Sequence, residues 1–132
     1  MAKLIHTMIR VRDLEPALGF YQQAFGLQVS HRLDFPDFTL VYLRNGETDA
    51  ELELTWNKGR AEPYTHADGY GHIAFCVDNV AAERQRFIDS GLSAGELHEF
   101  HNDRHDLLAR YFFIQDPDGY KIEVLERHGH YQ

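Results

Sequence analysis

Cysteine is nearly absent from this sequence, and long apolar runs and an excess of basic charge are missing altogether. The single cysteine, Cys76, has no partner within the chain for a disulfide, which favours a reducing compartment. No window approaches the roughly 18 consecutive apolar residues of a membrane helix, and the first ten residues lack the apolar core of a signal peptide. We therefore expect a cytoplasmic protein.

Acidic residues outnumber basic ones by 21 to 13, so the formal net charge is −8. A phosphate backbone is repelled by such a surface, and nucleic acid is not an expected partner. The chain has 132 residues, of which 43% are apolar and 26% charged. This composition is typical of one globular domain that buries roughly two-thirds of its unfolded surface.

Two segments of the chain resemble each other, residues 5–27 and residues 71–92. In each, a histidine stands five residues before a valine and fifteen residues before an aromatic ring, and a Gly-Leu pair ends the segment. The matched residues are His6 and His72, Val11 and Val77, Tyr21 and Phe87, and Gly26 and Gly91. Two copies are too few for a solenoid, so the pattern predicts an internally duplicated domain.

Each copy starts as a strand and continues as a helix. Residues 4–11 alternate side chains with the period of a strand. Residues 14–25 place apolar side chains at helical spacing, with Asp13 positioned to cap the helix and Gly26 to end it. In the second copy we expect Asn79 to cap the helix and both Phe87 and Ile88 to lie on its buried stripe.

Strand-like stretches follow each helix, and in the second copy a turn at Asp116–Gly119 separates the last two. These stretches are residues 27–33, 38–43 and 50–56, then residues 97–100, 109–115 and 120–126. Both halves therefore read β-α-β-β-β. The predicted organisation is one domain over residues 1–132, with a first module over about 1–57, a linker over about 58–69, a second module over about 70–127 and a loose tail over 128–132.

The duplication also relates two glutamates, Glu53 and Glu123, each in the last strand of its half. A lone histidine on a half-buried strand is most often a hydrogen-bonded core residue, and a lone glutamate most often lies on a solvated face. Taken together, the two imidazoles of His6 and His72 and the two carboxylates form a ligand set for a divalent transition metal, with coordination positions left open. A closed structural zinc site needs thiolates that this chain lacks.

A second group of histidines, His98, His101 and His105, would share one face if it lay on a helix. The segment around it is polar and has no apolar stripe. We therefore expect a solvated loop there rather than a metal site.

Several stretches together resemble the glyoxalase I (lactoylglutathione lyase) family of the vicinal oxygen chelate superfamily, from residue 4 to about residue 126. These stretches are IHTMIRVRDL, FYQQAFGL, ELTWNKG, GYGHIAFCVDN and DPDGYKIEVLE. The resemblance implies an α+β fold in which paired βαβββ modules form an eight-stranded cup. It also implies a homodimer in which each cup takes one module from each protomer.

The resemblance implies a reaction as well. The family isomerises the hemithioacetal of methylglyoxal and glutathione to S-D-lactoylglutathione through an enediolate, which removes toxic methylglyoxal. Its metal ligands fall on His6, Glu53, His72 and Glu123, with Ni²⁺ or Co²⁺ favoured and Zn²⁺ as an alternative. Glu123 falls at the position of the proton-transferring residue, with Glu53 able to assist. Arg10 and Asn57 match positions that hold the glutamyl group of glutathione.

One segment departs from the family pattern. Family members usually carry a lysine and glycines before the strand that leads to DPDG, where they hold the glycyl carboxylate of glutathione, and HNDRHDLLARYFF has neither. Arg104 and Arg110 are the candidates to replace that lysine. Three alternatives stay open: an epimerase, a dioxygenase, and a metal-free small-molecule or drug-binding protein of the same fold. The second carboxylate counts against a dioxygenase, which binds iron with two histidines and one carboxylate.

Overall fold

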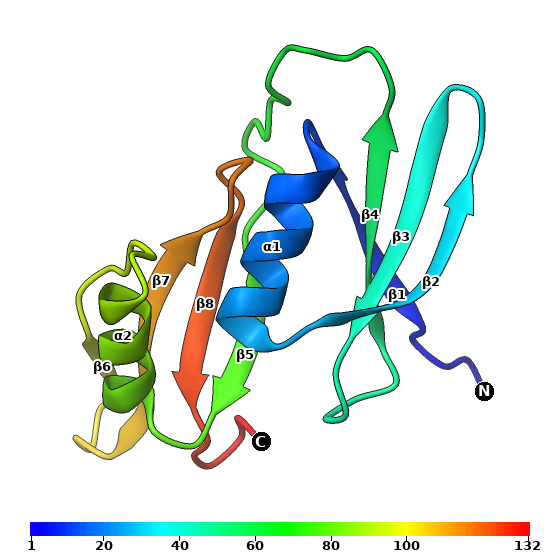
Figure 1. Cartoon of the computed structure of the whole chain (residues 1–132). Helices are drawn as coiled ribbons and strands as arrows, with labels where there is room; N and C mark the ends of the chain where they lie inside the picture. The colour runs from blue at the N-terminus through cyan, green and yellow to red at the C-terminus, as the bar shows by residue number, and fades with distance from the viewer. The chain divides into compact units, whose positions relative to one another are not determined.

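A computed structural model describes all residues 1–132, and the chain divides into two compact units. Unit 1 is Met1–Thr65 and unit 2 is His66–Gln132. Each unit contains one helix and four strands that follow one another in the same order along the chain (Figure 1). The boundary between the units lies within the stretch 58–69.

Unit 1 is built on a four-stranded sheet with the strand order β1-β4-β3-β2. β1 runs parallel to β4, and the other two pairs are antiparallel. The bounds are β1 (His6–Val11), α1 (Leu14–Phe25), β2 (Gln28–Asp34), β3 (Phe38–Arg44) and β4 (Glu51–Asn57).

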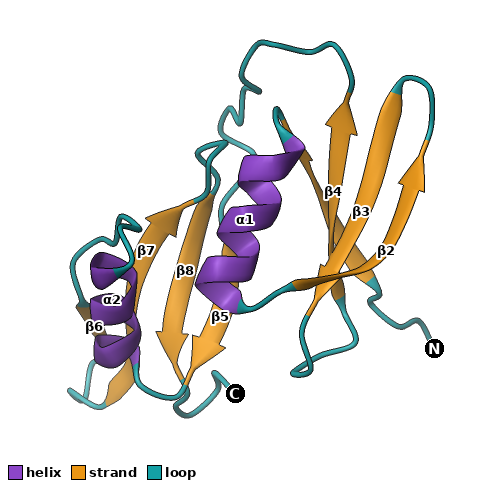
Figure 2. Cartoon of the chain, viewed as in Figure 1, coloured by secondary structure: helices purple, strands orange, loops and turns teal.

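Unit 2 repeats this topology, with the strand order β5-β8-β7-β6 and β5 parallel to β8 (Figure 2). The bounds are β5 (Ile73–Val77), α2 (Val80–Asp89), β6 (His98–His101), β7 (Leu107–Gln115) and β8 (Lys121–Glu126). The outer pairs also correspond, since β2 and β6 each contain a register shift against their neighbour. The predicted duplication and the β-α-β-β-β order of each half are thereby confirmed.

The two faces of each sheet carry different side chains. In unit 2 one face is largely apolar and buries Phe112, Ile122 and Val124 completely. Helix α2 packs on this face against β7 and β8, with the rings of Phe87 and Phe112 5.6 Å apart. Because strand residues alternate, the other face carries Phe113 and Glu123. We call it the histidine face of unit 2, since His72 lies on it. The histidine face of unit 1 carries His6, Met8, Arg10, Tyr42 and Glu53.

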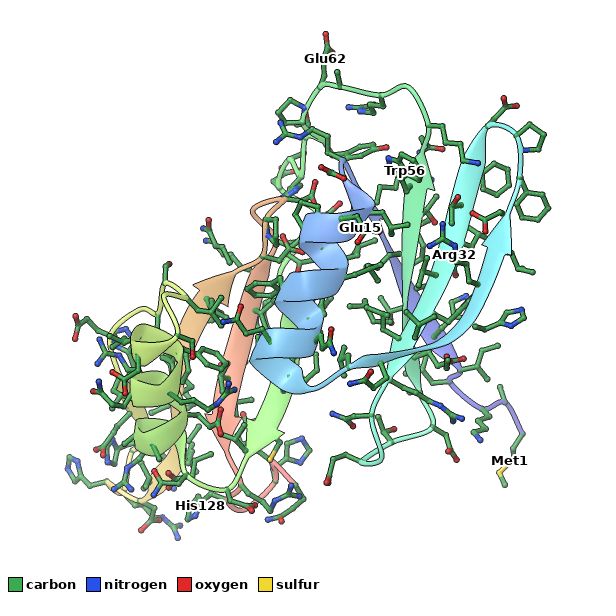
Figure 3. The ribbon with its side chains drawn as sticks, viewed as in Figure 1. Met1, Glu15, Arg32, Trp56, Glu62 and His128 are labelled. Atoms are coloured by element: carbon green, nitrogen blue, oxygen red, sulfur yellow. The ribbon has the colours of Figure 1, made fainter.

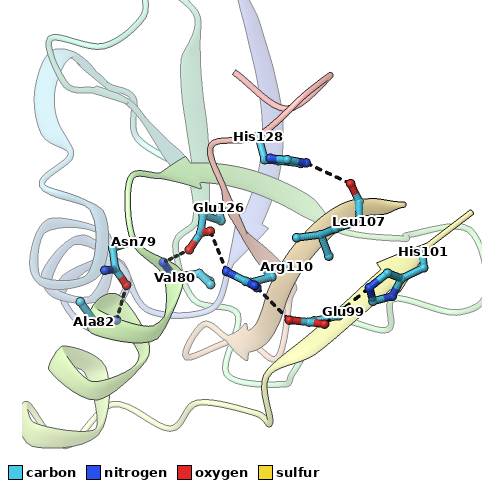
Figure 4. Close-up of polar contacts among 9 residues, drawn as sticks. All are labelled: Asn79, Val80, Ala82, Glu99, His101, Leu107, Arg110, Glu126 and His128. Carbon is cyan, nitrogen blue, oxygen red and sulfur yellow. Dashed lines mark hydrogen bonds and ion pairs between the residues drawn. The ribbon is translucent and has the colours of Figure 1, made fainter. Parts of the chain in front are cut away.

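Two of the three predictions for the helix ends are confirmed. The side chain of Asn79 accepts a hydrogen bond from the Ala82 amide at 2.9 Å, as predicted (Figure 4). Gly26 ends α1 in the left-handed conformation, with φ at 64°. Asp13 occupies the N-cap position of α1, but its side chain makes no capping hydrogen bond, so that part of the prediction is wrong. Neither helix is long and apolar enough to cross a membrane.

The prediction that both Phe87 and Ile88 are buried was also wrong. Phe87 is fully buried and Ile88 is 43% exposed. Successive residues of a helix point about 100° apart, so a single narrow face of α2 cannot bury both.

Two short turns fix the end of unit 2. At the predicted turn, Asp116 Oδ1 accepts hydrogen bonds from the amides of Asp118 and Tyr120, at 2.9 and 3.0 Å. The C-terminal tail was expected to be loose, but His128 and Tyr131 form two backbone hydrogen bonds. Gly129, with φ at 55°, allows this reversal. The ring of His128 also contacts the carbonyl of Leu107 at 3.0 Å (Figure 4).

Candidate metal centre

The first pair of candidate ligands meets on the histidine face of unit 1. His6 begins β1, and Glu53 lies in the middle of the neighbouring parallel strand β4, where it is level with Met8. The two side chains share a face, and Nε2 of His6 lies 2.9 Å from Oε2 of Glu53. Glu53 is 7% exposed, which differs from the solvated position typical of a glutamate beside leucines. A carboxylate this buried needs a partner, and a cation is the strongest one.

The second pair has the same geometry in unit 2. His72 directly precedes β5, and Glu123 lies on β8, the parallel neighbour of β5. Nε2 of His72 lies 3.0 Å from Oε2 of Glu123. The structure therefore brings each predicted histidine together with the glutamate of its own half.

No third histidine, cysteine, aspartate or glutamate joins either pair to form a group of metal-binding side chains. A catalytic transition-metal site generally takes at least three protein ligands. Imidazole nitrogen and carboxylate oxygen are suitable donors for a divalent ion, and they already face each other in each pair. The two side chains of each pair are therefore suitable donors for such an ion, and each unit offers two of them.

An aromatic ring accompanies each pair, and sequence reasoning missed both rings. Tyr42 lies directly across from Glu53 in the β3–β4 ladder, with its ring 5.6 Å from that of His6 at 73°. Phe113 lies directly across from Glu123 in the β7–β8 ladder, with its ring 5.5 Å from that of His72 at 78°. The available signal was an aromatic residue at the corresponding position of the strand before each glutamate.

The two aromatic rings differ in one hydroxyl group. Burial raises the pKa of Tyr42, and the negative charge of the neighbouring Glu53 raises it further. The Tyr42 hydroxyl thus keeps its proton at neutral pH. Phe113, which lies across from Glu123, has no hydroxyl group.

The two candidate substrate-binding residues lie at one end of the histidine face of unit 1. Arg10 is four residues beyond His6 on β1, which is about 13 Å along an extended strand. It is level with Thr55, and Asn57 is the last residue of β4. The Asn57 amide group donates to the Tyr64 hydroxyl at 3.0 Å. Both residues therefore lie on the same face as the His6–Glu53 pair but at a distance from it.

Of the two arginines that could replace the missing lysine, Arg110 lies on the face of the sheet opposite the histidine face of unit 2. Arg110 and Tyr111 are successive residues of β7, so their side chains lie on opposite faces of the sheet. The Arg110 guanidinium contacts Glu99 at 2.8 Å and Glu126 at 3.4 Å (Figure 4). The second of these glutamates accepts the amide of Val80 at the start of α2. These contacts raise the pKa of Arg110 and lower that of Glu99. Arg110 thus makes its ion pairs on the helix side of the sheet. Arg104 remains the candidate to replace the missing lysine.

The second histidine group does not form a site. His98 and His101 lie on strand β6 rather than in a loop, because backbone pairing with β7 satisfies this polar segment. His98 lies beside the ring of Tyr111 at 5.6 Å, and Nε2 of His101 lies 3.6 Å from a carboxylate oxygen of Glu99. His105 occupies a turn with φ at 66°. All three are exposed, and they do not converge.

Known proteins resemble this chain over nearly its whole length. The family model described as Glyoxalase/Bleomycin resistance protein/Dioxygenase superfamily matches residues 3–124. A lactoylglutathione lyase of Haemophilus influenzae is 37% identical over 128 residues, which cover 94% of this chain and 92% of the relative. A lactoylglutathione lyase of Neisseria meningitidis is 39% identical over 129 residues, covering 95% and 91%.

Solved structures agree with this result. A trypanothione-dependent glyoxalase I of Leishmania major superimposes with a TM-score of 0.76 at 33% identity, covering 96% of this chain and 87% of the other. Glyoxalase I of Zea mays gives a TM-score of 0.81 at 27% identity, covering 96% of this chain and 45% of the longer plant chain. The expected α+β fold with two βαβββ modules is therefore confirmed.

Proposed function

This chain belongs to the glyoxalase/bleomycin resistance protein/dioxygenase superfamily, and we propose that it is a metal-dependent lactoylglutathione lyase. Relatives more than a third identical over almost the full chain carry that name. The observation that carries the proposal is the duplicated His–Glu pair, at 2.9 Å in unit 1 and 3.0 Å in unit 2.

The proposed reaction relocates two protons within the hemithioacetal of methylglyoxal and glutathione. A carboxylate oxygen of Glu123 takes the proton from C1 and returns it to C2, and the hydroxyl proton on the C1 oxygen passes to the C2 oxygen. C1 thereby becomes the thioester carbonyl carbon and C2 the hydroxyl-bearing carbon, so atoms and charge balance. His6, Glu53, His72 and Glu123 would hold a divalent ion, with Ni²⁺ or Co²⁺ favoured over Zn²⁺. Such an ion would supply positive charge that stabilises the negative charge of a developing enediolate.

The site is proposed to form in a homodimer. Each unit holds only two ligands, and the pair His6–Glu53 of one chain would meet the pair His72–Glu123 of its partner. An interface of this kind obeys two-fold symmetry and yields two equivalent sites. We place the dimer in the cytoplasm, in keeping with the unpaired thiol of Cys76.

A metal-by-metal assay tests the proposed function. Protein stripped with a chelator and reloaded with Ni²⁺, Co²⁺ or Zn²⁺ is mixed with methylglyoxal and glutathione, and thioester formation is followed by its ultraviolet absorbance. We expect no turnover by the stripped protein and recovery with at least one of the three ions. Full activity without metal would contradict the proposal, and so would a lack of activity with every metal and thiol. Tight binding of the adduct without turnover would favour a binding protein.

A change at Arg10 tests the proposed thiol. Arg10→Ala is expected to raise KM for the glutathione adduct about tenfold with little change in kcat, because a charge-assisted hydrogen bond to the glutamyl carboxylate is lost. The exposed Lys3, whose ammonium lies 3.7 Å from Asp49, provides the control variant Lys3→Ala.

A thiol without the glutamyl group, cysteinylglycine, sharpens this prediction. Its adduct should show the same raised KM with the wild-type enzyme and no further rise with Arg10→Ala, since the partner group is already missing. A further tenfold rise with the variant would place Arg10 elsewhere in the site.

A further inference from the structure

The loop that follows β4 folds back onto the candidate substrate-binding residue Asn57. Asn57 ends β4 on the same face as Glu53, four residues farther along the strand. Its side-chain amide donates to the hydroxyl of Tyr64 at 3.0 Å, and its backbone carbonyl accepts the amide of Arg60 at 3.3 Å. Asn57 and Tyr64 are both half-buried. The loop therefore holds Asn57 through its backbone and through its side chain.

Tyr64 is held in place by the same loop. The guanidinium carbon of Arg60 lies 3.9 Å from the centre of the Tyr64 ring, which is a cation–π contact. The Arg60 side chain also donates to the backbone carbonyls of Glu62 and Pro63, at 3.1 and 3.0 Å. Gly59, with φ at 83°, allows the chain to turn back after β4. The Tyr64 hydroxyl thus has a defined position within unit 1.

The hydrogen bond to Tyr64 sets the orientation of the Asn57 carboxamide. The terminal torsion of an asparagine side chain is broad, so an amide without a partner samples several orientations. A carboxamide has two N–H donors and one carbonyl acceptor. With one N–H of Asn57 on Tyr64, the second N–H and Oδ1 remain for a ligand. This donor and acceptor complement an α-amino acid group, whose carboxylate accepts and whose ammonium donates.

Arg10 lies near this donor and acceptor. It shares a face with Asn57 and is level with Thr55, two residues earlier on the neighbouring strand. Two residues of an extended strand span about 7 Å. A ligand carboxylate placed between Arg10 and Asn57 therefore accepts hydrogen bonds from both, and those from the guanidinium are charge-assisted.

From these contacts we propose that Tyr64 is a positioning residue for the thiol-binding end of the site. Its hydroxyl holds the Asn57 amide so that Oδ1 accepts from the α-ammonium of a γ-glutamyl group. The second N–H of Asn57 and the guanidinium of Arg10 donate to the α-carboxylate of the same group. This inference rests on the proposed function, because the γ-glutamyl group belongs to the proposed thiol.

Three altered proteins and a control test the inference. Tyr64→Phe removes only the hydroxyl and keeps the ring beside Arg60, Asn57→Ala removes the positioned amide, and a double variant carries both changes. Tyr131→Phe is the matched control, because Tyr131 is a half-buried tyrosine of the C-terminal tail whose ring contacts His130 at 5.2 Å.

The probe is S-methylglutathione, a thioether that cannot form the hemithioacetal. Its dissociation constant is measured by calorimetry with Ni²⁺-loaded protein. A second probe has the same structure with its α-amino group acetylated. KM and kcat for the adduct of methylglyoxal and glutathione, and the thermal unfolding of each variant, are measured alongside.

Tyr64→Phe is expected to weaken S-methylglutathione binding about fivefold, the effect of one lost hydrogen bond, and to raise KM similarly with kcat within about twofold. Asn57→Ala is expected to weaken binding about tenfold. The double variant should bind no more weakly than Asn57→Ala alone, because Tyr64 acts through the missing amide. Tyr131→Phe should stay within about twofold of wild type. Acetylation of the probe should weaken its binding to the wild type.

The outcomes separate this inference from the proposed function. Wild-type affinity in Tyr64→Phe or in Asn57→Ala would overturn the positioning role, and so would a fivefold weakening by Tyr64→Phe that persists on top of Asn57→Ala. Equal binding of both probes by the wild type would contradict the contact between Oδ1 and the ammonium. In each of these cases, turnover by the wild type leaves the lyase reaction standing. A wild type that neither binds S-methylglutathione nor turns over the adduct refutes the proposed function, and the role of Tyr64 falls with it.

Discussion

Replacing Glu123 with glutamine is expected to lower kcat at least about a thousandfold, within the range that acid–base residues contribute. The amide has nearly the same shape but cannot take a proton from a carbon acid. The fold should persist, because Glu123 lies on the histidine face, while its neighbours Ile122 and Val124 are the fully buried residues of β8. The measurement is kcat at saturating metal, together with thermal unfolding of the variant.

Two further variants serve as controls for Glu123→Gln. Glu62 projects from the loop that follows β4 (Figure 3), so Glu62→Gln should leave kcat unchanged. Glu53→Gln should act mainly through weaker metal binding, and excess Ni²⁺ should restore part of its activity. A Glu123→Gln enzyme within tenfold of wild-type kcat would show that another group moves the proton.

Mixing two inactive chains is expected to restore activity. One chain carries His6→Ala with Glu53→Ala, and the other carries His72→Ala with Glu123→Ala. Each alone should be inactive, since every site lacks two ligands. After joint refolding, activity should return to about a quarter of the wild-type value, because random pairing makes half of the dimers mixed and each mixed dimer rebuilds one of its two sites.

This result depends on ligands being shared between chains. If a single chain supplied all four ligands of its own site, every chain in the mixture would lack two of them and no activity would return. Tags of different size on the two chains confirm that mixed dimers have formed. Mixed dimers without activity would contradict the shared site.

Much of the architecture was predictable because the sequence pattern of the first half recurs in the second half. Strand alternation places His6 on the face that Glu53 also occupies, and the same spacing recurs at His72 and Glu123. The helix cap at Asn79 and the turn at Asp116–Gly119 are local signals that depend on a few adjacent residues. Such features can be predicted from the sequence because the interactions that form them involve only residues close together in the chain.

The features that the sequence did not reveal depend on pairing between distant segments. The position of Tyr42 opposite Glu53 follows from the β3–β4 register, and the exclusion of Arg110 follows from the face on which β7 places it. The ordered tail needs the Leu107 carbonyl as a partner for His128, which lies far away in sequence. These contacts become visible only when the strands are aligned.

Diffraction from crystals grown with Ni²⁺, with data collected at the nickel absorption edge, tests the central claim most directly. We expect one anomalous peak per site, about 2.0–2.2 Å from Nε2 of both histidines and from an oxygen of both glutamates. His6 and Glu53 should come from one protomer and His72 and Glu123 from its partner. Crystals in which these four side chains surround no peak, while nickel binds elsewhere or not at all, would contradict the account.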